Sequence, residues 1–136
     1  MTGTAKWMWR ARGIEKEIQA LRDARQRTFD QLLRITQNYQ SDGAQNTKDP
    51  HKYDKLSELN DLIDRKETEL MQARYEITEV ILQIPSGNQR SVLLKYFVGG
   101  KTLEEIAVEN GCSARNVQNV RKRGLSWIEK NFPEVP

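Results

Sequence analysis

In the first two thirds of this 136-residue chain, two runs of mostly apolar residues have alternating steps of three and four. The spacing is typical of two packed helices and leaves few other folds open. The first run consists of Ile14, Ile18, Leu21, Arg25, Thr28, Leu32, Ile35 and Tyr39. The second run consists of Leu56, Leu59, Ile63, Lys66, Leu70, Ala73, Ile77, Val80 and Ile84. We interpret the polar members as residues that fix the register of the pair.

A short polar segment, "SDGAQNTKDP", separates the two runs and contains the turn residues Asp42, Gly43 and Pro50. Two helices of similar length joined in this way should form an antiparallel hairpin over residues 1–84, with a loop at 41–51. Charge favours the pairing, because residues 1–40 are net basic and residues 51–83 are net acidic. In this hairpin we expect polar contacts in the middle of the seam, with Arg25 and Thr28 near Lys66, Glu67 and Leu70.

Composition excludes several classes of protein. Outside a few short segments Gly and Pro are scarce, which favours an all-α fold. Cys112 and His51 stand alone, so we expect no disulfide, no metal site and no cofactor. No apolar run approaches the roughly 20 residues that cross a bilayer, so no membrane partner is expected. The chain also lacks a nucleophile with a base and a Gly-rich phosphate loop, so we do not expect an enzyme.

Trp7, Met8 and Trp9 place three large apolar side chains at the very start of the chain. We expect them to pack on the C-terminal domain or on a partner chain. A frayed N-terminal tail is the alternative interpretation.

The last third, residues 85–136, is predicted to form a separate domain. Pro85 ends the second long helix, a new helix begins near Asn88, and Gly99-Gly100 stops it. The buried positions of that helix should be Val92, Leu93, Tyr96 and Phe97.

Within this domain the stretch "TLEEIAVENGCSARNVQNVRKRG" has the signature of a helix-turn-helix. Thr102 and Glu105 predict a capping box, Gly111 ends the first helix, and Ser113 is a suitable N-cap for the second. Ala107 is small where the two helices must approach each other. The last helix is expected to bury Val117, Val120, Leu125 and Ile128.

The opposite face of that last helix carries groups that can address DNA. Arg pairs with guanine, and Gln or Asn pairs with adenine, in the major groove. Between residues 113 and 130 five basic residues stand against one acid. We therefore predict double-stranded DNA as a partner. The expected base-reading residues are Ala114, Arg115, Gln118 and Asn119, and the expected phosphate contacts are Thr102, Ser113, Arg121, Lys122 and Arg123.

A family resemblance rests on "QRSVLLKYFVGGKTLEEIAVENGCSARNVQNVRKRGLSWI", residues 89–128. This stretch resembles region 4 of bacterial sigma-70-type factors, which runs from Arg-x-x-x-Leu-x-x-x-Tyr through Gly-x-Thr-x-x-Glu-Ile-Ala to Ser/Thr-x-x-x-Val. The resemblance implies that the start of the last helix reads a promoter element, and it implies RNA polymerase as a further partner. Residues 1–84 show no resemblance to the sigma region that melts promoters.

Over nearly its whole length the chain is similar to small sigma-like regulators of late genes in phages and prophages of Gram-positive bacteria. This similarity implies a transcription regulator in the cytoplasm of a bacterial host, with the hairpin serving polymerase contact or a homo-oligomer. Two alternatives stay open. A small terminase-like DNA-packaging subunit would form a ring of many copies. A polymerase-binding interaction module would show no salt-sensitive affinity for DNA.

Overall fold

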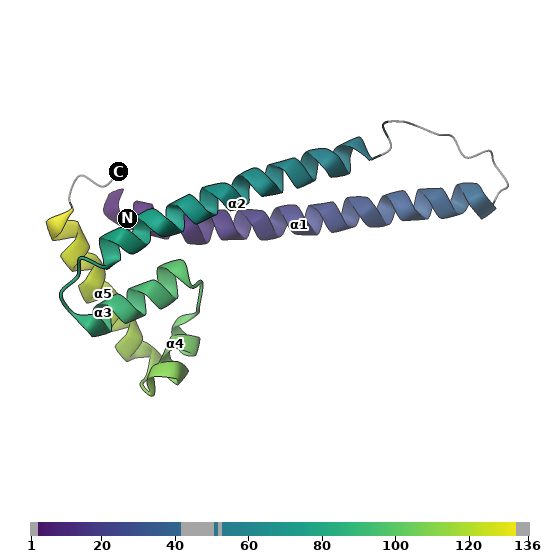
Figure 1. Cartoon of the computed structure of the whole chain (residues 1–136). Coiled ribbons are helices and arrows are strands. Elements are labelled where there is room, and N and C mark those ends of the chain that lie inside the picture. The colour runs from purple at the N-terminus through teal and green to yellow at the C-terminus, as the bar shows by residue number, and fades with distance from the viewer. Residues whose placement is uncertain (1–2, 42–50, 52, 133–136) are drawn as a thin grey trace. The chain divides into compact units, whose positions relative to one another are not determined.

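The structure, a computed structural model, describes residues 3–41, 51 and 53–132. Helix α1 covers Gly3–Ser41 and α2 covers Asp54–Ile81, and the two run antiparallel (Figure 1). The shorter elements that follow are α3 (Gly87–Leu93), the π-helix η1 (Leu94–Val98), α4 (Leu103–Asn110) and α5 (Ala114–Asn131). The described chain is therefore all-α, as the sequence predicts.

By contacts the chain divides into two compact units. The first unit comprises Met1–Ile14 and Leu70–Pro136, and the second comprises Glu15–Glu69. The start of α1 and the end of α2 thus pack with the C-terminal helices. That residues 85–136 fold as a separate domain stays a prediction.

The second unit corrects the expected register of the hairpin. Arg25 donates to the amide oxygen of Asn60 at 2.9 Å, and not to a residue near Lys66. Lys66 instead pairs with Glu17 at 2.8 Å, and Glu67 pairs with Arg22 at 2.5 Å. The partner of Lys66 therefore lies about two helical turns before Arg25 in α1, and the partner of Glu67 lies about one turn before it, so the predicted proximity is wrong.

The cause of this error is the unequal length of the two helices. α1 has 39 residues and α2 has 28, so the end of α1 extends past the start of α2 (Figure 1). Ile35 lies on this extension and is 48% exposed, although its spacing predicts a seam position. Ile18 and Ile63, by contrast, are buried, as expected. The side chain of Tyr39 lies outside the described residues.

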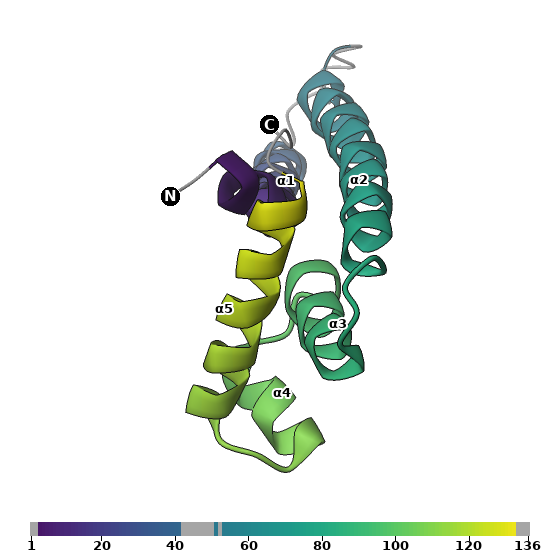
Figure 2. The ribbon, with the colours of Figure 1, turned by 90° about the vertical axis from the view of Figure 1, so that its left-hand side faces the viewer.

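The core of the first unit draws on every helix. α3 packs on α5, and α4 packs on α5 and η1 (Figure 2). α1 contributes Met8, Ala11 and Ile14, and α2 with its end contributes Ala73, Ile77, Ile81 and Ile84. The C-terminal elements add Val92, Leu93, Tyr96, Phe97, Ile106, Ala107, Val117, Val120 and Ile128. The four buried positions expected for the helix after Pro85 are thus confirmed.

The N-terminal aromatic residues pack on the C-terminal helices, which was one of the two expected arrangements. The ring of Trp9 meets Tyr96 edge-on at 5.2 Å and Phe97 at 5.4 Å between centroids. Met8 is fully buried, and Trp7 is half-buried. The alternative of a frayed tail is wrong for these residues, because α1 already begins at Gly3.

Gly124 explains a close approach that periodicity did not reveal. Gly124 is buried, whereas Leu125, which was expected in the core, is only half-buried. A Cβ atom on residue 124 would lie 2.5 Å from a methyl carbon of Leu93. The absence of a side chain therefore lets α5 lie directly against α3.

Candidate nucleic-acid interface

Local hydrogen bonds build the helix-turn-helix where the sequence predicts it. The N–H of Glu105 donates to the hydroxyl oxygen of Thr102 at 3.1 Å, and the Glu105 carboxylate accepts from the N–H of Thr102 at 3.4 Å. This is the predicted capping box. Gly111 ends α4 with φ of 65°, a conformation that strongly favours glycine. The three residues from Gly111 to Ser113 then join α4 to α5.

Ser113 caps the helix that was predicted to read DNA. Its hydroxyl oxygen accepts from the N–H of Asn116 at 3.1 Å, as expected for an N-cap. The helix dipole gives the N-terminal end of α5 a partial positive charge, which favours a nearby phosphate. The start of α5 is therefore suited to an anionic ligand.

Three of the four predicted base-reading residues share one face of α5 with Lys122, a predicted phosphate contact. Arg115, Gln118, Asn119 and Lys122 follow one another at steps of three, one and three residues, which keeps them on the same side of a helix. Arg115, Asn119 and Lys122 are exposed, and Gln118 is half-buried. Ala114, next to the N-cap, is also half-buried. The buried residues Val117, Val120, Gly124 and Ile128 occupy the other side.

The residues assigned to phosphate contact have different surroundings. Thr102, Ser113, Lys122 and Arg123 are exposed, and both capping hydroxyls keep a hydrogen to donate. Arg121 is half-buried, and its guanidinium lies 4.7 Å from the ring centroid of Tyr96 and 5.7 Å from that of Trp9. A cation over aromatic rings is stabilised by the ring quadrupole. Arg121 therefore connects α5 to the start of α1.

A second arginine connects α1 to the segment before α4. Arg12 donates to the carbonyl oxygens of Tyr96 at 2.8 Å and Lys101 at 3.2 Å, and its guanidinium lies 4.1 Å from the ring centroid of Tyr96. Tyr96 belongs to η1, whose wider turn carries the hydrogen bond from Gly99 to the carbonyl of Leu94 at 2.8 Å. Sequence reasoning missed both the π-helix and the role of Arg12, because periodicity reports neither.

Two lysines and Glu109 form a charged cluster across the helix-turn-helix. Lys101 pairs with Glu109 at 2.5 Å, and Lys95 donates to Asn110 at 2.9 Å while its Nζ lies 3.7 Å from the Glu109 carboxylate. The hydrogen bond from Lys101, with the positive charges of both lysines, holds the pKa of Glu109 below its ordinary value. The cluster ties the C-terminal end of α4 to the segments on either side of Gly100.

The Glu109 cluster predicts a pH dependence of stability. Because the folded pKa is lowered, the cluster stabilises the fold above the unfolded pKa of about 4.3, and this contribution is lost as pH falls through the folded pKa. As the pH falls from about 5 to about 3, the free energy of unfolding should therefore decrease less for Glu109→Gln than for the parent chain. Urea melts at several pH values measure the slope, and Glu104→Gln, an exposed carboxylate of the same helix, is the matched control. Equal slopes for the parent chain and Glu109→Gln would contradict the assignment.

The described residues define an all-α protein with a capped helix-turn-helix. Over 58 residues the chain is 36% identical to RNA polymerase sigma factor SigO of Bacillus subtilis (strain 168), a match that covers 43% of this chain. The match covers 32% of that sigma factor, so the chain spans about a third of the length of its relative. No family model and no solved structure matches the chain.

No group of three His, Cys, Asp or Glu side chains in the described ranges could hold a metal ion. Cys112 is a half-buried free thiol beside the turn. Among residues 3–41, 51 and 53–132, no helix is long and apolar enough to span a membrane.

Proposed function

We propose that the chain is a sequence-specific double-stranded DNA-binding transcription regulator. One observation carries the proposal: Arg115 and Asn119 are exposed on the first turns of a helix that follows a capped three-residue turn. The partial similarity to a sigma factor supports this function, because sigma factors act in transcription. RNA polymerase is the second partner that we propose, and late phage genes are the proposed targets.

In the proposed mechanism the start of α5 enters the major groove. Arg115, Gln118 and Asn119 hydrogen-bond to base edges, and Ala114 supplies an apolar contact. Lys122 and Arg123 neutralise phosphates and set the salt dependence, while Thr102 and Ser113 donate hydrogen bonds to the backbone of the DNA. For Arg121 we propose a positioning role in place of a phosphate contact, since its guanidinium already lies over Trp9 and Tyr96.

A selection of duplex DNA from a random pool at roughly physiological salt tests the proposal. The parent chain should enrich a motif that Arg115→Ala/Asn119→Ala loses. Arg27→Ala/Gln31→Ala is the matched control, because it removes an exposed Arg and an exposed amide at the same spacing on α1. A control variant that loses the motif equally, or a parent chain that enriches nothing, would refute the proposed reader.

Single variants then separate the two classes of contact. Arg115→Ala should weaken the selected site by about 1 to 3 kcal/mol and relax the preference at one base pair. Lys122→Ala should weaken all sequences alike and reduce the salt slope by about one. Equal and sequence-independent weakening by both changes would show that neither side chain reads a base. Sedimentation of the protein distinguishes a regulator of one or two copies from a packaging ring.

A further inference from the structure

An unpartnered apolar stripe runs along the exposed face of α2 in the first unit. Met71 is 67% exposed, Tyr75 is 61% exposed and Leu82, just past the helix end, is 57% exposed. The residues are four and seven positions apart, so they lie on one side of a helix over a length of about 16 Å. Residue 82 continues this helical path, since its N–H donates to the carbonyl of Thr78 at 3.0 Å. The core residues Ala73, Ile77 and Ile81 occupy the other side.

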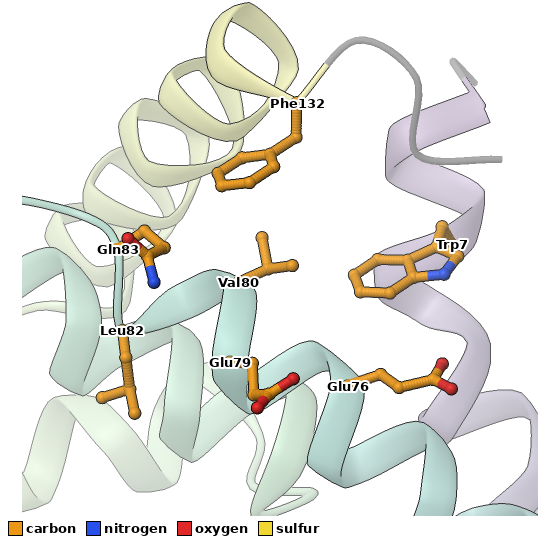
Figure 3. Close-up of a pocket in the computed structure, with 7 residues that line it drawn as sticks. All are labelled: Trp7, Glu76, Glu79, Val80, Leu82, Gln83 and Phe132. Atoms are coloured by element: carbon orange, nitrogen blue, oxygen red, sulfur yellow. The ribbon is translucent and has the colours of Figure 1, made fainter.

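The stripe leads into a pocket of about 690 Å³. Figure 3 shows Trp7 of α1 and Phe132, at the end of α5, on either side of the hollow, with Val80 of α2 between them. Leu82 belongs to both the stripe and the pocket lining. Aromatic and aliphatic walls of this kind accept the large apolar side chain of a ligand.

Contacts within the unit hold the walls of the pocket in place. The guanidinium of Arg10 lies 4.9 Å from the ring centroid of Trp7 and pairs with Glu76 at 2.6 Å. The ring of Phe132 lies 6.1 Å from that of Trp127, and the N–H of Phe132 donates to the carbonyl of Ile128 at 2.7 Å. The pocket is thus formed before any partner arrives, which lowers the cost of binding.

One flank of the stripe carries acidic side chains. Gln72, Glu76, Glu79 and Gln83 follow one another at steps of four, three and four residues beside the apolar stripe, and the last three line the pocket. Arg10 neutralises Glu76. Glu79 is exposed, and among the described residues its carboxylate accepts a hydrogen bond from the hydroxyl of Tyr75. A complementary partner therefore presents an apolar stripe with a basic flank.

We propose that this surface, the Met71–Tyr75–Leu82 stripe with the Trp7–Val80–Phe132 pocket, binds a basic amphipathic helix of a partner protein. One large apolar residue of that helix enters the pocket, and the next apolar residues follow the stripe at helical spacing. A basic side chain on its flank meets Glu79. The surface lies outside α4 and the reading face of α5, so this proposal does not rest on DNA binding.

Two labelled 14-residue model peptides test the proposal by fluorescence anisotropy. Both carry leucines at helical spacing, and their polar positions are all Lys in one peptide and all Glu in the other. The Lys peptide should bind the full chain with one-to-one stoichiometry, and the Glu peptide should bind at least about tenfold more weakly. Equal binding of both peptides would overturn the charge argument.

Matched variants locate the binding surface. Leu82→Arg should weaken the Lys peptide about tenfold, and Val108→Arg should leave it unchanged. Both variants add one positive charge, and Val108 is 83% exposed on α4. Glu79→Gln should weaken binding several-fold relative to Glu104→Gln. If the melting temperature of Leu82→Arg is lower than that of the parent chain, Tyr75→Lys replaces it as the variant of the stripe.

Three results would overturn the proposed partner. Equal weakening by Leu82→Arg and Val108→Arg would show that the peptide binds elsewhere. A dimer in sedimentation that Leu82→Arg dissociates, with no peptide bound, would show that a second copy covers the stripe. Binding to vesicles of anionic phosphatidylglycerol that Leu82→Arg abolishes, again with no peptide bound, would assign the surface to lipid.

Discussion

A chain that begins at Glu15 is expected to lose the cooperative fold of residues 70–132. The deletion removes Met8 and Ile14 from the core, together with the ring of Trp9 against Tyr96. Burial of a large apolar side chain contributes about 1.5 to 3 kcal/mol, so these three together contribute about 5 kcal/mol or more. A domain of this size has a total stability of about 5 to 15 kcal/mol. Thermal melts followed by far-UV circular dichroism and by Trp127 fluorescence measure the loss.

A chain that begins at Thr4 is the control for this deletion. It carries a new N-terminus but keeps every buried residue of α1, so its melting should match that of the full chain. If the chain from Glu15 melted as cooperatively as this control, the C-terminal helices would not need the start of α1. The expected collapse would show instead that residues 85–136 depend on a segment far away in the sequence.

The sequence predicted best those features that depend on neighbouring residues. The capping box of Thr102 and Glu105, the positive φ of Gly111 and the N-cap at Ser113 all follow from contacts within four residues. Local rules of this kind hold wherever the helix ends lie in the fold. The helix-turn-helix was therefore predictable almost residue by residue.

Features that depend on tertiary packing were not predictable from periodicity. The predicted register of the hairpin was wrong because the pattern does not show that α1 is 11 residues longer than α2. The apolar pattern predicted Leu125 in the core, yet Gly124 is the buried residue, and its missing side chain lets α3 approach. Charge counting assigned Arg121 to phosphate, and only the geometry places it over Trp9 and Tyr96.

The candidate site shows the same division. Exposure of Arg115, Asn119 and Lys122 follows from the helical spacing of the buried valines, so the candidate reading face could be drawn from the sequence. The contacts that hold the elements behind this face could not be predicted from the sequence. Arg12 reaches the carbonyls of Tyr96 and Lys101 from more than 80 residues away, and Tyr96 lies within the π-helix η1. The contacts by which Arg12 holds η1 and the segment before α4 are therefore a finding of the structure.

Phe97→Ala is expected to lower the free energy of unfolding by about 3 to 5 kcal/mol, the range for loss of a buried Phe. Phe97 is 1% exposed, and its ring meets Trp9 at 5.4 Å and Tyr96 at 5.0 Å in edge-on geometry. The truncation removes the ring's apolar contacts and leaves a cavity into which close-packed surroundings relax only partly. Urea denaturation followed by tryptophan fluorescence measures the change.

Two further variants show whether this loss belongs to the aromatic cluster. Val108→Ala removes an apolar side chain of the same unit that is 83% exposed, so its effect should stay within about 0.5 kcal/mol. A double-mutant cycle of Phe97→Ala with Trp9→Ala should give a coupling of about 0.5 to 1.5 kcal/mol, because the rings touch edge-on. Strict additivity would mean that Trp9 stabilises the fold independently of Phe97. A measurable coupling would show that the start of α1 stabilises η1 by direct contact between the rings.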